Sequence, residues 1–211
     1  MKNIDIRHLG TIAYQDALSV MLDLRAKRQK NLIPDTLLFL QHQPVITSGR
    51  QDAADDLKVK SNVLKEMGVD YQLTDRGGRL TFHGPGQLVI YFILDIVARG
   101  LSVDELVCQS LSVIQDYLKK IGLEAIYDKE NPGLWIGDKK IAAVGFHIQK
   151  GITTHGISFN ICNDLSVYDL FIPCGIQNKD VTSIECERQQ KVSIDQVEQI
   201  LAQSYSDFFA D

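Results

Sequence analysis

The strongest constraint on the fold is the run 88–96, LVIYFILDI, which is apolar on both faces of an extended chain. Its uninterrupted apolar part, 88–94, is far shorter than the ~20 residues that span a bilayer. A run of this kind is typical of a central β-strand that other layers cover on both sides. We therefore expect a strand over 87–96, at the centre of a sheet with helices on its faces.

Amphipathic segments predict the helices that supply these layers. They lie at about 14–30, 62–67 and 102–122, and a last one begins at Ser193. The third is the most clearly marked, because Ser102 and Glu105 form a capping box at its start and Gly122 ends it. In the last helix we expect four inward-facing side chains: Val197, Ile200, Leu201 and Tyr205.

Strand-like runs separate these helices. We expect strands over 36–41, 45–48, 71–74, 87–96, 134–136, 140–149 and 155–161. Helices interspersed with clusters of strands predict the α/β (α+β) class, with one main mixed β-sheet flanked by helices. The sequence contains no internal repeat and no linker-like tract, so we expect a single domain over residues 1–211.

Composition excludes several classes of function. Lys plus Arg is 22 and Asp plus Glu is 27, for a formal net charge of −5. Such a chain lacks the overall basic character of sequence-independent nucleic-acid binding, so no nucleic-acid partner is expected. The N-terminus lacks the apolar core of a signal peptide, which favours a cytoplasmic protein without membrane contact. Four cysteines without a C-x-x-C pair argue against a disulfide scaffold or a zinc site.

The segment 75–87, DRGGRLTFHGPGQ, is the first candidate site. It places four glycines, two arginines and a histidine in thirteen residues. Glycine permits close backbone approach, so the segment is suited to wrapping a ligand with backbone donors. A tight β-hairpin whose glycines only serve the turn explains the composition equally well. His83 and His155 both precede glycines in loop-like stretches and are candidates to line a site.

Cys174 is the best candidate nucleophile, because it lies between a proline and a glycine in a loop. Cys108 and Cys162 fit the usual role of free cysteine as a small buried hydrophobe. Carboxylates beside Cys186 would blunt its nucleophilicity. Strand alternation puts Lys139 and Lys140 on opposite faces, so one of them can point inward, where an ammonium would stabilise a thiolate. A metal set of His42, His83, His155 and Cys174 matches no ligand spacing, and no metal is expected.

Three ordered blocks resemble the octanoyltransferases of lipoate biosynthesis, the lipoate-protein ligase B family. They are RGGRLTFHGPGQLV over 76–89, KIAAVG over 140–145, and HGISFN over 155–160 leading to PCG over 173–175. An upstream QHQPV over 41–45 also looks like the family's early strand motif. The resemblance spans about residues 5–180. The chain departs from it at Ser158, where a smaller apolar residue is expected, and at Ile90 and Phe92, where Gly and Pro are commoner.

The resemblance implies a fold, an activity and a site. The fold is that of the biotin/lipoate protein ligases, and the activity moves an octanoyl (or lipoyl) group from acyl carrier protein to a lysine of a lipoyl domain. Cys174 matches the family's acyl-thioester cysteine and Lys140 the lysine paired with it. The substrate-binding stretches matched are Arg76, Gly77, Gly78, Arg79, Leu80, Thr81, Phe82 and His83, then Ala143, Val144 and Gly145, then Gly156, Ile157 and Ser158.

The implied partners are octanoyl-acyl carrier protein as donor and, as acceptors, the lipoyl domains of 2-oxoacid dehydrogenases and the glycine cleavage H protein. Because these partners are acidic, we expect a local basic surface, with one candidate cluster at Arg25, Lys27, Arg28 and Lys30. Basic residues that complement the dipole at a helix C-terminus are the commoner explanation of such a cluster. A monomer is expected. Passing an acyl group from a thioester to an amide is downhill, so neither nucleotide nor any other cofactor is expected. Backbone N–H groups near Gly175 or the Gly77–Gly78 turn are candidates to hold the oxyanion.

Three other functions remain open. An ATP-dependent lipoate or biotin ligase of the same superfamily would not need Cys174 and would require ATP and Mg²⁺. A cysteine hydrolase would use Cys174 with His83 or His155 and would release the acid without a lysine acceptor. A non-catalytic module would bind an acyl carrier or lipoyl domain without forming acyl-cysteine.

Overall fold

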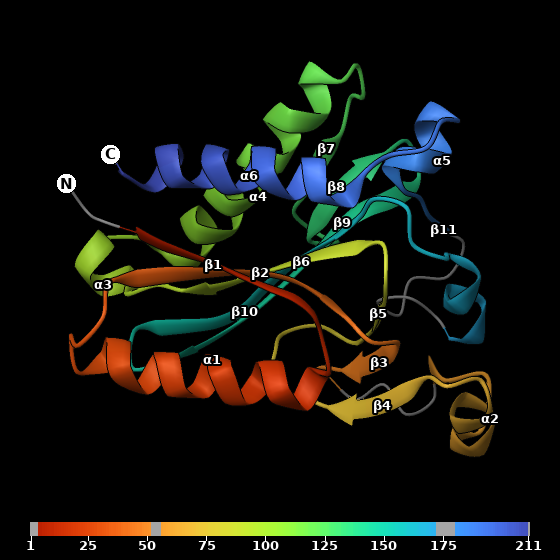
Figure 1. Cartoon of the computed structure of the whole chain (residues 1–211), viewed down its shortest axis with the longest axis horizontal. Helices are drawn as coiled ribbons and strands as arrows, with labels where there is room; N and C mark the ends of the chain where they lie inside the picture. Colours follow the sequence, from red (N-terminus) through yellow and green to blue (C-terminus); the bar gives the residue numbers. More distant parts are fainter. Residues whose placement is uncertain (1–3, 52–55, 172–179, 211) are drawn as a thin grey trace.

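The computed structural model describes residues 4–51, 56–171 and 180–210. Its main sheet has the strand order β1-β2-β6-β10-β9-β8-β7, and β11 pairs with β9 (Figure 1). The bounds in that order are Ile4–Ile12, Asp35–His42, Gln87–Ile93, Ile152–Asn160, Lys139–Gln149, Gly133–Ile136, Ile126–Asp128 and, for β11, Asp180–Val181.

The apolar run forms β6, near the middle of this sheet, and every residue of β6 is buried, as the sequence predicted. The sheet is mixed, because β1 and β11 pair in parallel with their neighbours and the other contacts are antiparallel. The strand expected over 87–96 ends earlier, at Ile93. The Asp95 side chain accepts a hydrogen bond from the Ala98 N–H and so caps the short helix α3, Ile96–Arg99.

Helices cover both faces of the sheet (Figure 1). Helix α1, Tyr14–Gln29, buries Ala17, Met21 and Leu24 against β2, β6 and β10. Helices α4, Val103–Lys120, and α6, Ile194–Ala210, pack on the opposite face. These findings confirm the predicted class, a mixed sheet flanked by helices.

Two details of the helices test the sequence reasoning. The capping box of Ser102 and Glu105 is present at the start of α4, as predicted. The inward direction predicted for Ile200 is wrong, because this side chain is 49% exposed. Val197, Leu201 and Tyr205 repeat at intervals of four and define the buried stripe, and Ile200 lies beside it.

A second, three-stranded sheet stands beside the main one in the order β4-β3-β5. Its strands are β4, Asp70–Leu73, β3, Val45–Ser48, and β5, Leu80–His83. Helix α2, Ser61–Glu66, and the 3-10 helix η2, Ser166–Leu170, flank it, and α5, Ile184–Arg188, precedes α6. The sequence did not predict β1, β5, β7 or this second sheet. His83 and His155 accordingly lie in β5 and β10, not in loops.

Candidate active site

A cavity lies between the main sheet and the glycine-rich segment that runs into β5. It holds about 530 Å³, counting its open mouth. All the predicted substrate-binding residues except Phe82 line it, together with Lys140, Tyr14, Val89, Tyr91, Pro132 and His155. Phe82 alternates to the other face of β5, where its ring packs edge-on against Tyr168. Composition left two roles open for the segment 75–87, a hairpin or a ligand-binding loop. In the structure it both forms strand β5 and covers a cavity.

Glycines let this segment lie directly on the sheet. The Gly77 N–H donates to the Phe146 carbonyl at 3.1 Å. A Cβ at Gly145 would come within 3.0 Å of the Gly77 oxygen, and one at Gly156 within 2.3 Å of the Ile90 oxygen. Gly145 and Gly156 pair with each other across β9 and β10 and form part of the cavity floor. Because the Gly77 N–H is already engaged, the Gly78 N–H is the remaining candidate oxyanion donor in this turn.

Arg76 organises the covering segment. Its guanidinium is buried and donates to the Thr47 carbonyl at 2.6 Å, the Gly77 carbonyl at 2.9 Å and the Arg79 carbonyl at 2.8 Å. Arg79 forms a two-bond ion pair with Asp56, at 2.6 and 2.9 Å. The two arginines of the motif therefore fix the loop over the cavity.

Lys140 marks one end of the cavity. It is 7% exposed while Lys139 is exposed, so the alternation predicted for this pair is confirmed. The Lys140 Nζ lies 4.8 Å from the centre of the Trp135 ring and 3.3 Å from the Pro132 carbonyl, to which it donates. Cys174, the predicted nucleophile, lies outside the described residues, and so does Gly175.

Four rings close the other end of the cavity, and we call them the end wall: Tyr14, His42, Tyr91 and His155. Ring centres are 5.5 Å apart for Tyr14 and His42, and 5.8 Å apart both for His42 and Tyr91 and for Tyr91 and His155. The His42 Nε2 lies 2.8 Å from the Tyr91 hydroxyl oxygen, so these two side chains are hydrogen-bonded. All four residues are buried, and all except His42 line the cavity.

His155 is unusual within this wall. Its φ of 59° lies in the left-handed region, which costs a non-glycine residue energy and concentrates at functional sites. Its Nε2 bonds the Asp75 carboxylate at 2.8 Å, and this bond lowers the pKa of Asp75 to about 2. His147 also approaches Asp75, at 3.4 Å.

The buried histidines are neutral at pH 7. Burial lowers the pKa of His42 to about 4, and burial also lowers the pKa of His155 and takes that of His83 well below its usual range. Burial raises the pKa of Tyr14 to about 12. Among the described residues, no three His, Cys, Asp or Glu side chains gather as a metal site. The rings of the end wall are thus uncharged, and the Asp75 carboxylate bonded to His155 is the charged group beside them.

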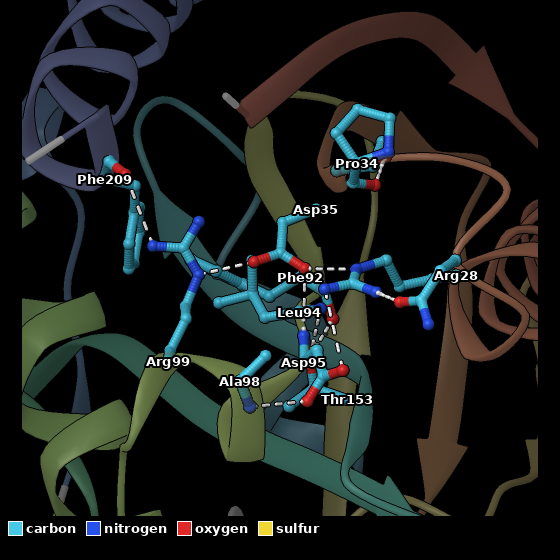
Figure 2. A network of polar contacts seen from close by, with 12 residues as sticks. Arg28, Pro34, Asp35, Phe92, Leu94, Asp95, Ala98, Arg99, Thr153 and Phe209 are labelled. Atoms are coloured by element: carbon cyan, nitrogen blue, oxygen red, sulfur yellow. Dashed lines mark hydrogen bonds and ion pairs between the residues drawn. The ribbon is translucent and has the colours of Figure 1, made fainter. Parts of the chain in front are cut away.

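Two further sequence interpretations need correction. Cys108 is exposed on α4, not buried, and Cys186 is exposed too, while Cys162 is half-buried. Arg28 does not belong to an open basic surface, because its side chain is only 12% exposed and bonds Asp35 (Figure 2). Lys27 pairs with Asp23 at 2.6 Å. The predicted basic cluster is therefore partly neutralised.

Sequence reasoning missed the roles of Tyr14, Tyr91, Asp75 and Pro132 at this site. Tyr91 was read only as part of the apolar strand, and Tyr14 only as the start of a helix. A signal was present for Tyr91, since a phenol inside a buried run needs a hydrogen-bond partner. In the structure that partner is His42.

The fold is that of the lipoate and biotin protein ligases. A lipoate-protein ligase A bound with ATP matches all of this chain and 86% of its own, with a TM-score of 0.78 and 18% identity. A biotin protein ligase from Aquifex aeolicus, in complex with biotin and ATP, matches all of this chain and 71% of its own, with a TM-score of 0.57 and 14% identity. These likenesses define the fold.

Sequence comparisons identify the family. The lipoyl protein ligase A/B catalytic domain matches residues 13–206. An octanoyltransferase of Caldicellulosiruptor saccharolyticus is 37% identical over 98% of this chain and 88% of its own. A mitochondrial octanoyl-[acyl-carrier-protein]:protein N-octanoyltransferase of Danio rerio is 37% identical over 96% and 90%. This chain belongs to the lipoyl protein ligase A/B family and, within it, to the octanoyltransferases, which are acyltransferases.

No helix in the described part of the chain has the length and apolar character needed to cross a membrane.

Proposed function

We propose that this protein transfers an octanoyl group from octanoyl-acyl carrier protein to the lysine of a lipoyl domain through a thioester on Cys174. The observation that carries the proposal is the cavity itself. It gathers three sequence stretches that are far apart in the chain, and it ends at a buried lysine. Its lining by Val89, Ala143 and the rings of Tyr14 and Tyr91 suits an alkyl chain.

The first half-reaction forms the acyl-enzyme. A free cysteine with a pKa of about 8.5 is only a few per cent thiolate at neutral pH, and a neighbouring ammonium raises that fraction. The Cys174 thiolate attacks the donor's thioester carbonyl. The new C–S bond forms as the bond to the carrier's sulfur breaks, and the carrier's thiolate takes up a proton.

The second half-reaction forms the amide. The acceptor lysine, as a neutral amine, attacks the carbonyl of acyl-Cys174, and the cysteine sulfur leaves. The amine nitrogen must lose a proton in this step, and we assign its acceptance to neutral Lys140 as general base. No oxidant, reductant or nucleotide enters the balance.

The acceptors we propose are the lipoyl domains of 2-oxoacid dehydrogenases and the glycine cleavage H protein. A single domain over 1–211, a monomeric state and a cytoplasmic location remain predictions from the sequence. So does docking at the basic residues of α1 that stay on the surface.

The test supplies octanoyl-acyl carrier protein and an isolated lipoyl domain, without ATP or Mg²⁺. Mass spectrometry should show a lipoyl domain heavier by one octanoyl group, about 126 Da, only when the enzyme is present. Free octanoate with ATP and Mg²⁺ should give no product. A product that requires ATP would instead indicate a ligase, release of octanoate without an acceptor a hydrolase, and a tight complex without transfer a binding module.

A further inference from the structure

Tyr14 separates the cavity from a second hollow on the protein surface. This outer groove holds about 720 Å³, counting its open side, and is lined by Tyr14, Leu18, Leu22, Arg50, Leu73, Thr74 and Asp75. Among the described residues, Tyr14 is the side chain that lines both the cavity and the groove. The residue is only 4% exposed. The phenol ring therefore lies between the two spaces.

The register of the sheet puts Tyr14 at the end of the cavity remote from Lys140. Lys140, Ala143 and Gly145 line the cavity in this order along β9. Gly145 pairs with Gly156 of β10. Gly156 in turn pairs with Tyr91, a member of the end wall. The five residue-to-residue steps from Lys140 to Gly145 span roughly 16 Å along the strand.

An octanoyl chain fits this distance. Extended, its seven carbon–carbon bonds reach roughly 9 Å. With the carbonyl held beside Lys140, its terminal methyl passes Ala143 and stops short of the end wall. A ten-carbon chain, at roughly 11 Å, still fits, whereas the terminal methyl of a twelve-carbon chain, at roughly 14 Å, would meet the rings of that wall.

Tyr14 is the most loosely held ring of the end wall. Its buried hydroxyl makes no hydrogen bond of good geometry among the described residues, and a weak contact with the Thr74 side chain opposes the burial that raises its pKa. The Tyr91 hydroxyl bonds His42, and the His155 ring bonds Asp75. Beyond Tyr14, the groove presents Leu22 and Leu73, both exposed. Removal of the Tyr14 ring would thus join the cavity to an apolar surface at the loss of only the weak contact with Thr74.

We propose that Tyr14 sets the upper limit on acyl-chain length, as a plug between the acyl cavity and the outer groove. This inference rests on the proposed octanoyl transfer. In the wild type the ring stops chains of about twelve carbons or more. Without it, the terminal carbons of a longer chain would pass into the groove and lie on Leu18, Leu22 and Leu73.

The experiment compares octanoyl-, decanoyl- and dodecanoyl-acyl carrier protein as donors for the wild type and for Tyr14→Phe, Tyr14→Leu and Tyr14→Ala. The readout is the ratio of kcat/KM for each long donor to kcat/KM for octanoyl. A ratio is unaffected by a general loss of active enzyme. Tyr14→Phe keeps the ring and should keep the wild-type ratio.

Tyr14→Ala should raise the dodecanoyl ratio at least tenfold, since each methylene moved out of water contributes about fourfold. Tyr14→Leu should give a smaller rise, and it preserves the test if Tyr14→Ala does not fold. Unchanged ratios in both variants, or the same rise in Tyr14→Phe, would overturn the plug. A wild type that transfers no octanoyl group would refute the proposed function instead, so the two failures are distinguishable.

Discussion

Two buried polar clusters lie at different places in this molecule, and they are built differently. The first, the Asp35 network, consists of Arg28, Asp35, Asp95 and Arg99 (Figure 2). Asp35 accepts hydrogen bonds from the Arg28 Nε at 2.7 Å, from the Arg99 Nε and from the Asp95 N–H at 3.0 Å. Two cations meet two anions. Arg99 further reaches the Phe209 carbonyl, so the network ties α1, β2, α3 and α6 together.

The end wall of the cavity is the second cluster. Its histidines are neutral, its Tyr14 hydroxyl has only a weak contact with Thr74, and its His155 holds a left-handed backbone conformation. The Asp35 network uses nearly all of its polar capacity on the fold, although one Arg99 nitrogen has no described partner. The contrast indicates that the charged network stabilises the fold, whereas neutral rings and a strained backbone mark the site.

The largest effect on stability should come from Asp35→Ala. It leaves Arg28 and Arg99 buried without their shared carboxylate, which costs about 3–5 kcal/mol. Urea unfolding measures the loss. Asp95→Ala is the matched control, because Asp95 is more exposed and lies 3.6 Å from Arg28, and should cost about 1 kcal/mol through the cap of α3. Equal costs for the two variants would contradict a network centred on Asp35.

The largest effect on activity should come from Lys140→Met. The substitution keeps an unbranched stem beside Trp135 but removes the proton acceptor, so single-turnover transfer should slow at least a hundredfold. Lys139→Met, on the exposed neighbour, should leave the rate within twofold. Similar rates for the two variants would remove Lys140 from the mechanism.

Acid should destabilise the protein through the end wall. The folded pKa of His42 is about 4 and the ordinary value is 6.5, so below pH 6.5 the unfolded chain binds a proton that the folded chain refuses. Stability is therefore complete above pH 6.5 and falls toward pH 4, by about 1.4 kcal/mol per pH unit for this group. Urea unfolding between pH 7 and 5 should show a shallower fall in His42→Gln. Parallel curves would contradict a buried, neutral His42.

The smallest effect should come from Cys108→Ser, which alters an exposed side chain on α4. The change in unfolding free energy should stay within about 0.5 kcal/mol. A loss of unfolding free energy above 1 kcal/mol would instead support the buried position that the sequence suggested for Cys108.

Features set by neighbours in the chain were predictable. The capping box of α4 and the inward turn of Lys140 depend on three or four consecutive positions, and both are present. The central strand was predictable from its own composition, because a strand exposed on one face would not carry apolar side chains on both faces. The residues around the cavity came from the ordered motifs, because a family resemblance carries information that spacing alone does not.

Features set by distant partners were not predictable. Strand β5 is flanked by glycines that resemble turns, and only its pairing with β3 makes it a strand. Arg28 looked like a surface cation because its partners lie outside its helix: Asp35 follows on β2, and Asp95 precedes α3. The role of Tyr14 depends on two hollows that meet only in three dimensions.

The most direct test of the account is the intact mass of the enzyme after incubation with octanoyl-acyl carrier protein alone. The wild type should gain one octanoyl group, about 126 Da, and digestion should place it on Cys174. Cys174→Ala should gain nothing and should transfer nothing. An adduct of the same mass in Cys174→Ala, or transfer without any adduct, would contradict the acyl-cysteine mechanism.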